Sequence, residues 1–306
     1  MASTGSVPPA PSRWRDAVTL TKPGITGLIV LVAVGGFFLA APAQPAWDRL
    51  VLLVVTGTAG SAGAAMLNHY FDRDLDARMR RTRSRPLPAD RIAPPGLVLA
   101  GGVGLLGGGV VAAALVLNPL TGVSILLGGL TYVVVYTIWL KRRSSWNIVI
   151  GGFAGSAPAL AGGAAATGTW SPAVLLFALL VFLWTPPHFW SLALLLRSDY
   201  QAAGLPMLPR MDDPAFSGRV VVVSAAALVP PTAALWWVGP ITWPAGIALV
   251  ALAIGFVVVT APLWRATDRP TALRGFVYSG PYLIGVIGAL IVNWGLLLRG
   301  FAPAFG

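Results

Sequence analysis

The chain has 306 residues, of which 56% are apolar and only 10% are charged, whereas an ordinary soluble domain carries about 25% charged residues. With a mean hydropathy of +0.77, this composition excludes a typical soluble globular protein and indicates a polytopic membrane protein built from spanning helices. The sequence contains no cysteine, which excludes disulfides, thiolate metal sites and cysteine nucleophiles. Any chemistry must therefore come from carboxylates, cations and other polar side chains.

Nine apolar segments of helix length follow one another along the chain, and each predicts a membrane-spanning helix. They cover residues 24–42, 50–67, 97–117, 121–140, 147–166, 172–190, 220–238, 243–264 and 275–298. Most are close to the ~20 residues that a helix needs to cross a bilayer. We expect a single all-α domain over residues 1–306, in which about nine helices surround a central cavity capped by polar cytoplasmic loops. Residues 1–20 are expected to form a flexible cytoplasmic N-terminus.

Basic residues are distributed unevenly between the connections. The chain has 21 Lys and Arg against 10 acidic residues, all of them Asp, and a formal net charge of +11. When the predicted spans alternate in direction, every Lys and Arg except Arg49 and Arg299 falls on the side of the N-terminus. Because cytoplasmic loops collect Lys and Arg, we expect the N-terminus in the cytoplasm and the C-terminus outside. This sidedness explains the basic excess, so no nucleic-acid partner is expected.

The first long cytoplasmic connection, about 68–96, concentrates acidic and basic side chains. If the helix of the second span continues into it, Asn68, Asp72 and Asp76 are spaced by four residues and share one face. Two carboxylates and an amide oxygen offer the hard ligands that Mg²⁺ takes together with substrate phosphates, and the arginines that follow suit the phosphate charge. The alternative is a solvated helix end, with surface ion pairs worth about 0–1 kcal/mol each.

The second long cytoplasmic connection, about 191–219, follows an aromatic helix end whose residues 184–190 read WTPPHFW. Asp199 is in a position to complete a site opposite the aspartates of the first connection, and Arg197 to hold a phosphate. The alternative is that the aromatic side chains form only an interfacial belt and that the two prolines only bend the helix.

Several blocks of the sequence resemble the UbiA-type intramembrane prenyltransferases. The matching blocks are residues 21–24, 68–88, 136–142, 146–152, 184–190 and 199–209. The aspartate block is shared by the superfamily and is typical of prenyl diphosphate chemistry, whereas 184–190 and 204–209 resemble the branch that farnesylates haem. Two positions depart from the family pattern. Asp199 stands alone where many members have a fuller second aspartate motif, which speaks against a two-metal arrangement, and Asn293 stands where the family often has an acid.

The resemblance implies Mg²⁺-dependent transfer of the farnesyl group of farnesyl diphosphate to a vinyl group of haem B, with addition of water, giving haem O. The metal ligands that it implies are Asn68, Asp72, Asp76 and Asp199. The cations that it implies for the diphosphate are Arg81, Arg85, Lys141 and Arg197. It also implies a haem contact at His188, with Trp184 and Tyr200, and imidazole is a common axial ligand of haem iron. A hydrogen bond at a helix end is the alternative role for that histidine.

Two other functions stay open on the sequence. One is a sister enzyme that prenylates an aromatic quinone precursor, which would share the aspartate block. The other is a non-catalytic transporter or assembly protein. Such a protein would carry intramembrane charges along its pathway, and the predicted spans contain essentially none. We therefore expect an enzyme of the plasma (inner) membrane that is embedded in the lipid bilayer, with haem A synthase or oxidase-assembly proteins as partners.

Overall fold

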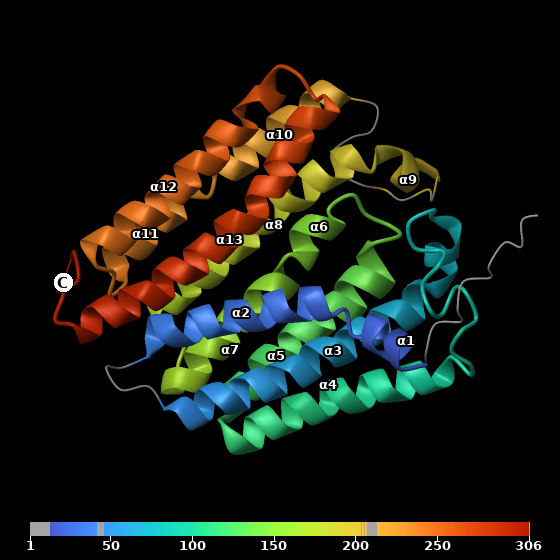
Figure 1. The fold of residues 1–306 in the computed structure, drawn as a ribbon, viewed down its shortest axis with the longest axis horizontal. Helices are drawn as coiled ribbons and strands as arrows, with labels where there is room; N and C mark the ends of the chain where they lie inside the picture. The colour runs from blue at the N-terminus through green and yellow to red at the C-terminus, as the bar shows by residue number, and fades with distance from the viewer. Residues whose placement is uncertain (1–12, 42–45, 203, 205, 207–212, 306) are drawn as a thin grey trace, which may run out of the picture.

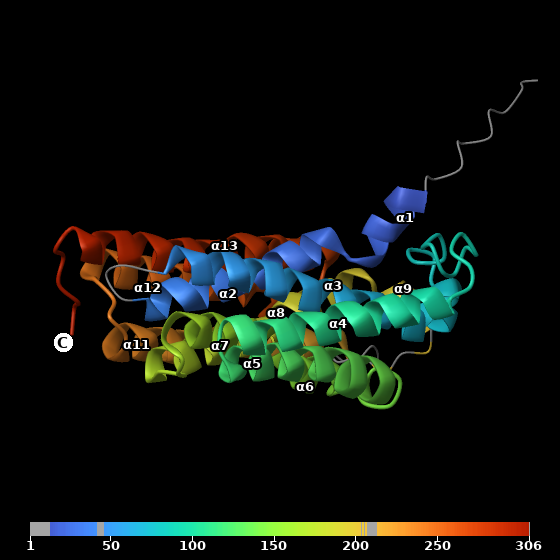
Figure 2. The ribbon, with the colours of Figure 1, turned by 90° about the horizontal axis from the view of Figure 1, so that it is seen from below.

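The computed structural model describes residues 13–41, 46–202, 204, 206 and 213–305, and every regular element in these ranges is helical. Nine helical segments among them are long and apolar enough to cross a membrane, which confirms the predicted all-α architecture. The helices run side by side as an elongated bundle (Figures 1 and 2). Residues 1–12, which belong to the predicted flexible N-terminus, lie outside the described residues.

The spans follow the predicted order, and four of them are built from two helical pieces. They are α2 (Pro23–Ala40), α3 (Trp47–Arg78), α4 (Gly96–Val116), α5 (Pro119–Leu130) with the π-helix η1 (Thr131–Leu140), α6 (Asn147–Gly151) with α7 (Phe153–Thr167), α8 (Pro172–Leu195), α10 (Pro214–Ala226) with α11 (Val229–Val238), α12 (Trp243–Thr260) with the 3₁₀ turn η2 (Ala261–Trp264), and α13 (Arg269–Leu298). Two short helices, α1 (Arg13–Leu20) and α9 (Arg197–Ala202), lie outside the spans.

Proline and a capping residue mark the start of several spans. Asn118, Ser171 and Asp268 each accept a hydrogen bond from the backbone N–H three residues further on, and a proline occupies the first turn of α5, α8 and α13. The caps satisfy N–H groups that a helix leaves unpaired at its start, where proline has no N–H to lose. The predicted span 172–190 begins at the residue where α8 begins, Pro172.

Glycine allows close contact between neighbouring helices. A Cβ at Gly162 of α7 would overlap the carbonyl oxygen of Ala33 in α2, and a Cβ at Gly63 of α3 would overlap the backbone nitrogen of Leu106 in α4. Because lipid provides no hydrophobic drive between helices, membrane bundles depend on such close packing of small residues.

Two elements at the charged end differ from the sequence prediction. α3 continues past the predicted end of its span at residue 67 to Arg78, so the aspartate block is helical. Residues 13–20 were predicted to be flexible, but they form α1. The cause is tertiary contact with the connection at 79–95. Asp16 is 4% exposed and accepts hydrogen bonds from Nη2 and Nε of Arg91 at 2.9 and 3.1 Å, and Leu20 packs against Leu87.

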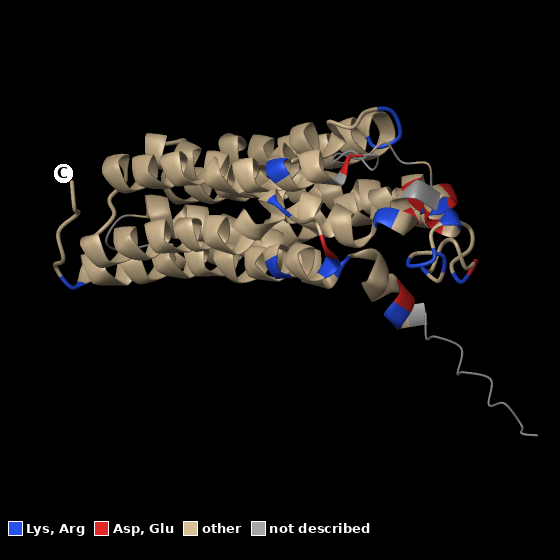
Figure 3. Cartoon of the chain, turned by 90° about the horizontal axis from the view of Figure 1, so that it is seen from above, with Lys and Arg blue, Asp and Glu red and all other residues tan. Residues whose placement is uncertain are grey.

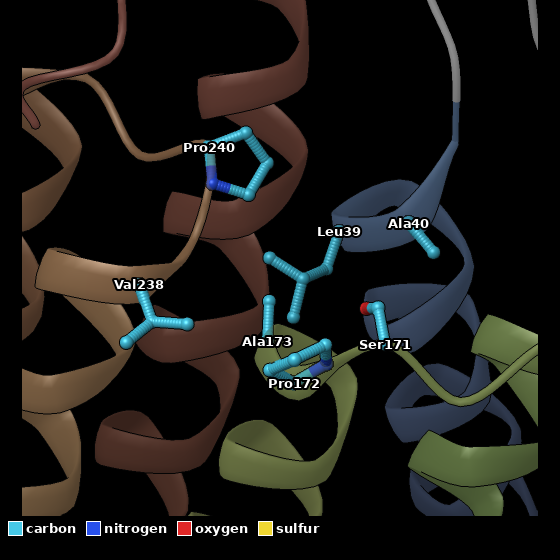
Figure 4. A pocket seen from close by; sticks show the side chains of 7 residues that line it. All are labelled: Leu39, Ala40, Ser171, Pro172, Ala173, Val238 and Pro240. Carbon is cyan, nitrogen blue, oxygen red and sulfur yellow. The ribbon is translucent and has the colours of Figure 1, made fainter. Parts of the chain in front are cut away.

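The two ends of the bundle differ in polarity. Charged residues gather at the end remote from the C-terminus (Figure 3). At the other end, the Asn293 side chain of α13 accepts hydrogen bonds from the backbone N–H and the hydroxyl of Thr242 and donates one to the carbonyl oxygen of Pro240. Asn293 therefore fixes the turn between α11 and α12. An apolar cavity of about 270 Å³ lies beside that turn, between the ends of α2, α8 and α11 (Figure 4).

Candidate active site

The last turns of α3 present a polar stripe to the interior of the bundle. Asn68, Asp72 and Asp76 are 3%, 1% and 1% exposed, because a spacing of four residues keeps them on one helical face. The Asn68 amide donates hydrogen bonds to Asp72 Oδ2 and to the Thr137 hydroxyl, both at 2.9 Å. The predicted register of these three residues is therefore the one that the structure shows. Below, these three residues are called the aspartate stripe.

Each aspartate of the stripe binds one cation through one oxygen. Lys141 Nζ donates to Asp72 Oδ2 at 2.5 Å, and Arg85 Nη1 donates to Asp76 Oδ2 at 2.7 Å. Both residues were predicted as diphosphate-binding cations from their blocks. The two ion pairs bring the connection after η1 and the connection after α3 onto the same helical face.

A third cation at the stripe, Lys22, is one that the sequence analysis missed. Its Nζ donates to Asn68 Oδ1 at 2.5 Å and to the Tyr132 hydroxyl at 3.0 Å. Lys22 caps α2 with left-handed backbone angles (φ 46°). The available signal was its position directly before Pro23 at the start of a span, within a block that resembles the family.

The π-helix η1 determines which of its side chains reach the stripe. Tyr132, Thr137 and Lys141 contact Lys22, Asn68 and the first aspartate of the stripe, respectively. In an α-helix the nine positions from Tyr132 to Lys141 make about two and a half turns, so the two side chains would point to opposite sides. Hydrogen bonds that reach five residues back, such as the one from the Lys141 backbone N–H, widen the turn and bring both to one side.

The stripe fits a hard divalent cation. Oδ1 of Asp72 and Oδ1 of Asp76 are buried and accept no hydrogen bond within the described part of the chain. Unpaired buried carboxylate oxygens are costly, and two carboxylates with an amide oxygen form a donor set that Mg²⁺ accepts when phosphates and water complete it. Among the described residues, no group of three or more His, Asp or Glu side chains converges on one point, so the two aspartates of the stripe need ligands from elsewhere to complete a metal site.

Burial and charge shift the pKa values of two groups near the stripe. Burial lowers the pKa of Lys22 to about 8, and the charge of Arg85 acts in the same direction while the aspartates of the stripe oppose it. Burial raises the pKa of Tyr200 in α9, with the charge of Arg81 opposing this and that of Asp199 adding to it. The charge of Arg81 also lowers the pKa of Lys22, so this residue acts on both groups although its own side chain is exposed.

The other predicted ligands from α9 do not join the stripe through a described contact. Asp199 and Arg197 are half-buried on that short helix. The described residues show no hydrogen bond or ion pair between either side chain and the aspartates of α3. Their roles as a metal ligand and as a phosphate-binding cation stay predictions.

The residues predicted to contact haem fall into two groups. His188 stacks on Trp184 with ring centroids 4.5 Å apart and an interplanar angle of 20°. Both residues belong to the part of α8 that packs against α13. Tyr200 packs against a different apolar cluster, which includes Leu75 and Trp190. The predicted trio is therefore an aromatic pair plus one tyrosine nearer the charged connections.

The sequence is similar to that of one family of known proteins. Residues 28–280 match the UbiA prenyltransferase family. A protoheme IX farnesyltransferase of Symbiobacterium thermophilum is 41% identical over 291 residues, which cover 91% of this chain and 94% of the relative. One from Alkalilimnicola ehrlichii is 40% identical over 287 residues, 92% of each chain. The protoheme IX farnesyltransferase of Roseiflexus castenholzii is 39% identical, and this chain spans about half (53%) of its length.

Solved structures share the fold. A UbiA homologue from Archaeoglobus fulgidus bound to GPP and Mg²⁺ has a TM-score of 0.71 at 16% identity, with 90% of this chain and 99% of that chain covered. A structure from work on digeranylgeranylglyceryl phosphate synthase has a TM-score of 0.74 at 17% identity, with 92% and 98% covered.

The chain belongs to the UbiA prenyltransferase family, which confirms the resemblance found in its sequence blocks. Within that family, the curated relatives at about 40% identity are protoheme IX farnesyltransferases, the haem-farnesylating branch that residues 184–190 and 204–209 indicated.

Proposed function

We propose that this chain transfers the farnesyl group of farnesyl diphosphate to a vinyl group of haem B, giving haem O. The observation that carries the proposal is the buried aspartate stripe with three cations around it, at the charged end of a membrane bundle. The relatives named protoheme IX farnesyltransferase support the choice of the two substrates.

The reaction sets out what the site must do. The allylic carbon–oxygen bond of farnesyl diphosphate breaks, and its electron pair leaves with the diphosphate. The π electrons of the vinyl group form the new carbon–carbon bond, and water adds to the resulting cation with loss of a proton. The protein must therefore neutralise the departing diphosphate and keep water away from the farnesyl cation until the vinyl group has reacted.

Asp72 and Asp76, with the amide oxygen of Asn68, are the residues that would hold Mg²⁺. When bound, this ion supplies Lewis-acid stabilisation of the leaving diphosphate. The unpaired Oδ1 atoms of both aspartates support this assignment, and so does the Mg²⁺ bound with GPP in the homologue from Archaeoglobus fulgidus. Asp199 is proposed as a further ligand contributed by α9.

The cations of the site would bind the diphosphate. Lys141, Arg85 and Lys22 already lie on the stripe, so all three cations are close to the residues that would hold the metal. Arg85 offers the planar fork that matches phosphate. Arg81 and Arg197 are proposed to act from the neighbouring connections.

The aromatic pair of α8 is the proposed contact for haem. His188 would approach the haem iron, because imidazole is a common axial ligand. Trp184 stacks on it and would extend the apolar surface against the porphyrin. Tyr200 is proposed to line the path between this pair and the diphosphate, since it packs against the apolar cluster that includes Trp190 of α8.

The charge distribution supports an orientation in the membrane. We propose that the chain lies in the plasma (inner) membrane, with its N-terminus in the cytoplasm and its C-terminus outside, since the charged end of the bundle (Figure 3) carries the excess of Lys and Arg. Haem A synthase or oxidase-assembly proteins are the proposed partners that would receive the product.

Product analysis tests the proposal. The protein is purified in detergent or lipid, incubated with Mg²⁺, farnesyl diphosphate and either haem B or 4-hydroxybenzoate, and the products are identified by mass. We expect farnesylated, hydrated haem and no prenylated hydroxybenzoate. If a prenylated aromatic acid forms instead, the acceptor is an aromatic acid and not haem. If neither acceptor gives a product, the proposal is overturned.

A further inference from the structure

One serine of α13 contacts both rings of the aromatic pair. Ser279 Oγ lies 2.6 Å from Nδ1 of His188, and the carbonyl oxygen of Ser279 accepts a hydrogen bond from Trp184 Nε1 at 2.9 Å. Ser279 is buried, and the helix pair α8 and α13 forms part of the main apolar core. A single residue thus sets the position of two rings that come from the facing helix.

The hydroxyl of Ser279 has one proton, and its neighbours determine where that proton points. Ser279 Oγ also lies 2.5 Å from the carbonyl oxygen of Phe276. A carbonyl cannot donate, so the serine must donate its proton there. Its contact with His188 can then be made only if the serine oxygen accepts, and the proton in that hydrogen bond belongs to Nδ1 of the histidine.

This arrangement determines the state of the other ring nitrogen. A neutral imidazole that is protonated at Nδ1 carries its free lone pair at Nε2. Nε2 of His188 makes no hydrogen bond within the described residues, and it is not among the fully buried polar atoms that lack a partner, so it retains accessible surface. The ring is held between Trp184 and Phe276, with centroid distances of 4.5 and 5.1 Å.

We propose that Ser279 is a positioning residue that fixes His188 in the Nδ1–H tautomer and thereby presents Nε2 as the axial ligand for the iron of the haem substrate. This rests on the proposed function, because it requires haem as the acceptor. Histidine ligands of metal sites are commonly held in the same way: the ring nitrogen that does not bind the metal donates a hydrogen bond to an oxygen, which orients the ring.

The tautomer can be measured directly, without haem. The chain has two histidines, so protein labelled with ¹⁵N-histidine gives few signals, and loss of one set in His188→Ala assigns them. We expect a protonated Nδ1 and an unprotonated Nε2 at His188 in the wild type and in Ser279→Thr, which keeps the hydroxyl. A wild-type His188 with its proton on Nε2 overturns the inference, whether or not any Ser279 variant folds.

Haem titration tests the consequence. Ferric haem b is titrated into the purified protein, with the visible spectrum and electron paramagnetic resonance as readouts. We expect His188→Ala to lose the signature of a nitrogen ligand and Ser279→Ala to weaken haem binding by about tenfold or more, with Ser279→Thr close to wild type. Ser191→Ala is the matched control, since Ser191 is also buried but donates only to the backbone of its own helix.

Product formation separates this inference from the proposed function. If the wild type forms haem O while Ser279→Ala binds haem with the wild-type affinity and spectrum, the positioning role is overturned and the proposed function stands. If the wild type neither binds haem nor forms haem O, the proposed function fails, and the positioning role fails with it.

Discussion

Two ion pairs join aspartates of α3 to cations that follow η1, and they differ in burial and in hydrogen bonding. Asp72 pairs with Lys141, and their side chains are 1% and 13% exposed. Asp74 pairs with Arg142, and their side chains are 49% and 38% exposed. The two aspartates are two residues apart, so the turn of one helix sends the first into the bundle and the second to its surface.

The exposed pair is complete, whereas the buried pair is not. Arg142 donates through two nitrogens to both oxygens of Asp74, each at 2.7 Å, and this hydrogen bonding raises the pKa of Arg142. Lys141 contacts only Oδ2 of Asp72 and leaves Oδ1 unpaired. Burial of an ion pair repays its desolvation only when the remaining polar atoms are also satisfied. We therefore expect a ligand to complete the buried pair, while the exposed pair needs none.

Metal removal is expected to have the largest effect on this difference. Treatment with EDTA should stop farnesyl transfer, and added Mg²⁺ should restore it, because the unpaired oxygens of the stripe lose the ion they would hold. Turnover is followed by product mass. Full activity in excess EDTA would contradict the metal assignment, and recovery with Mg²⁺ controls for damage by the chelator.

Substitution of the two aspartates separates the pairs directly. Asp72→Asn removes one carboxylate from the stripe and should lower kcat by on the order of 10²–10³-fold, the range found when one charge-stabilising group is removed from an active site. Asp74→Asn is the matched control and should change kcat less than about threefold, because its carboxylate faces the surface. Equal effects in the two variants would show that burial does not define the site.

The register of the aspartate stripe could be predicted because it is local. Asn68, Asp72 and Asp76 repeat every four residues, and a helix that continues past the membrane face aligns them whatever surrounds it. The nine spans were predictable for the same reason, since apolar length identifies each one separately. These are properties of short stretches of sequence.

The side chains that contact the site residues come from distant parts of the sequence. The sequence analysis therefore missed these residues or did not predict their contacts. Lys22 meets an asparagine 46 positions away, and Ser279 meets a histidine 91 positions away. No proline or glycine interrupts Thr131–Leu140 to signal that this segment winds as a π-helix, so the alignment of Tyr132 with Lys141 follows only from tertiary packing. The sequence blocks identified Lys141 as a candidate, but they did not predict its contact with Asp72.

A pH titration should show whether the half-buried Lys22 carries its charge during the reaction. Burial lowers the pKa of Lys22 to about 8, so the residue is charged at pH 7 and mostly neutral at pH 9. We expect kcat/KM for farnesyl diphosphate, which reports the free enzyme, to fall by about tenfold over this interval as the attraction for phosphate is lost.

Lys22→Arg provides the control for that titration. Arginine stays charged over the whole interval, so kcat/KM of this variant should stay flat between pH 7 and 9 even if its value at pH 7 differs from wild type. A wild-type profile that stays flat, or an unchanged fall in Lys22→Arg, would assign the pH dependence to another group.

The smallest effect is expected for the exposed pair itself. A double-mutant cycle with Asp74→Asn and Arg142→Gln, measured by thermal unfolding in detergent, should give a coupling of about 0–1 kcal/mol. The coupling should decrease further at high salt, because exposed charges are screened. The same cycle on Asp72 and Lys141 should give a larger and less salt-sensitive value, since removing one partner leaves the other charge buried. If the exposed pair gave the larger coupling, burial would not be what distinguishes the two pairs, and the spare oxygen of Asp72 would lose its significance for ligand binding.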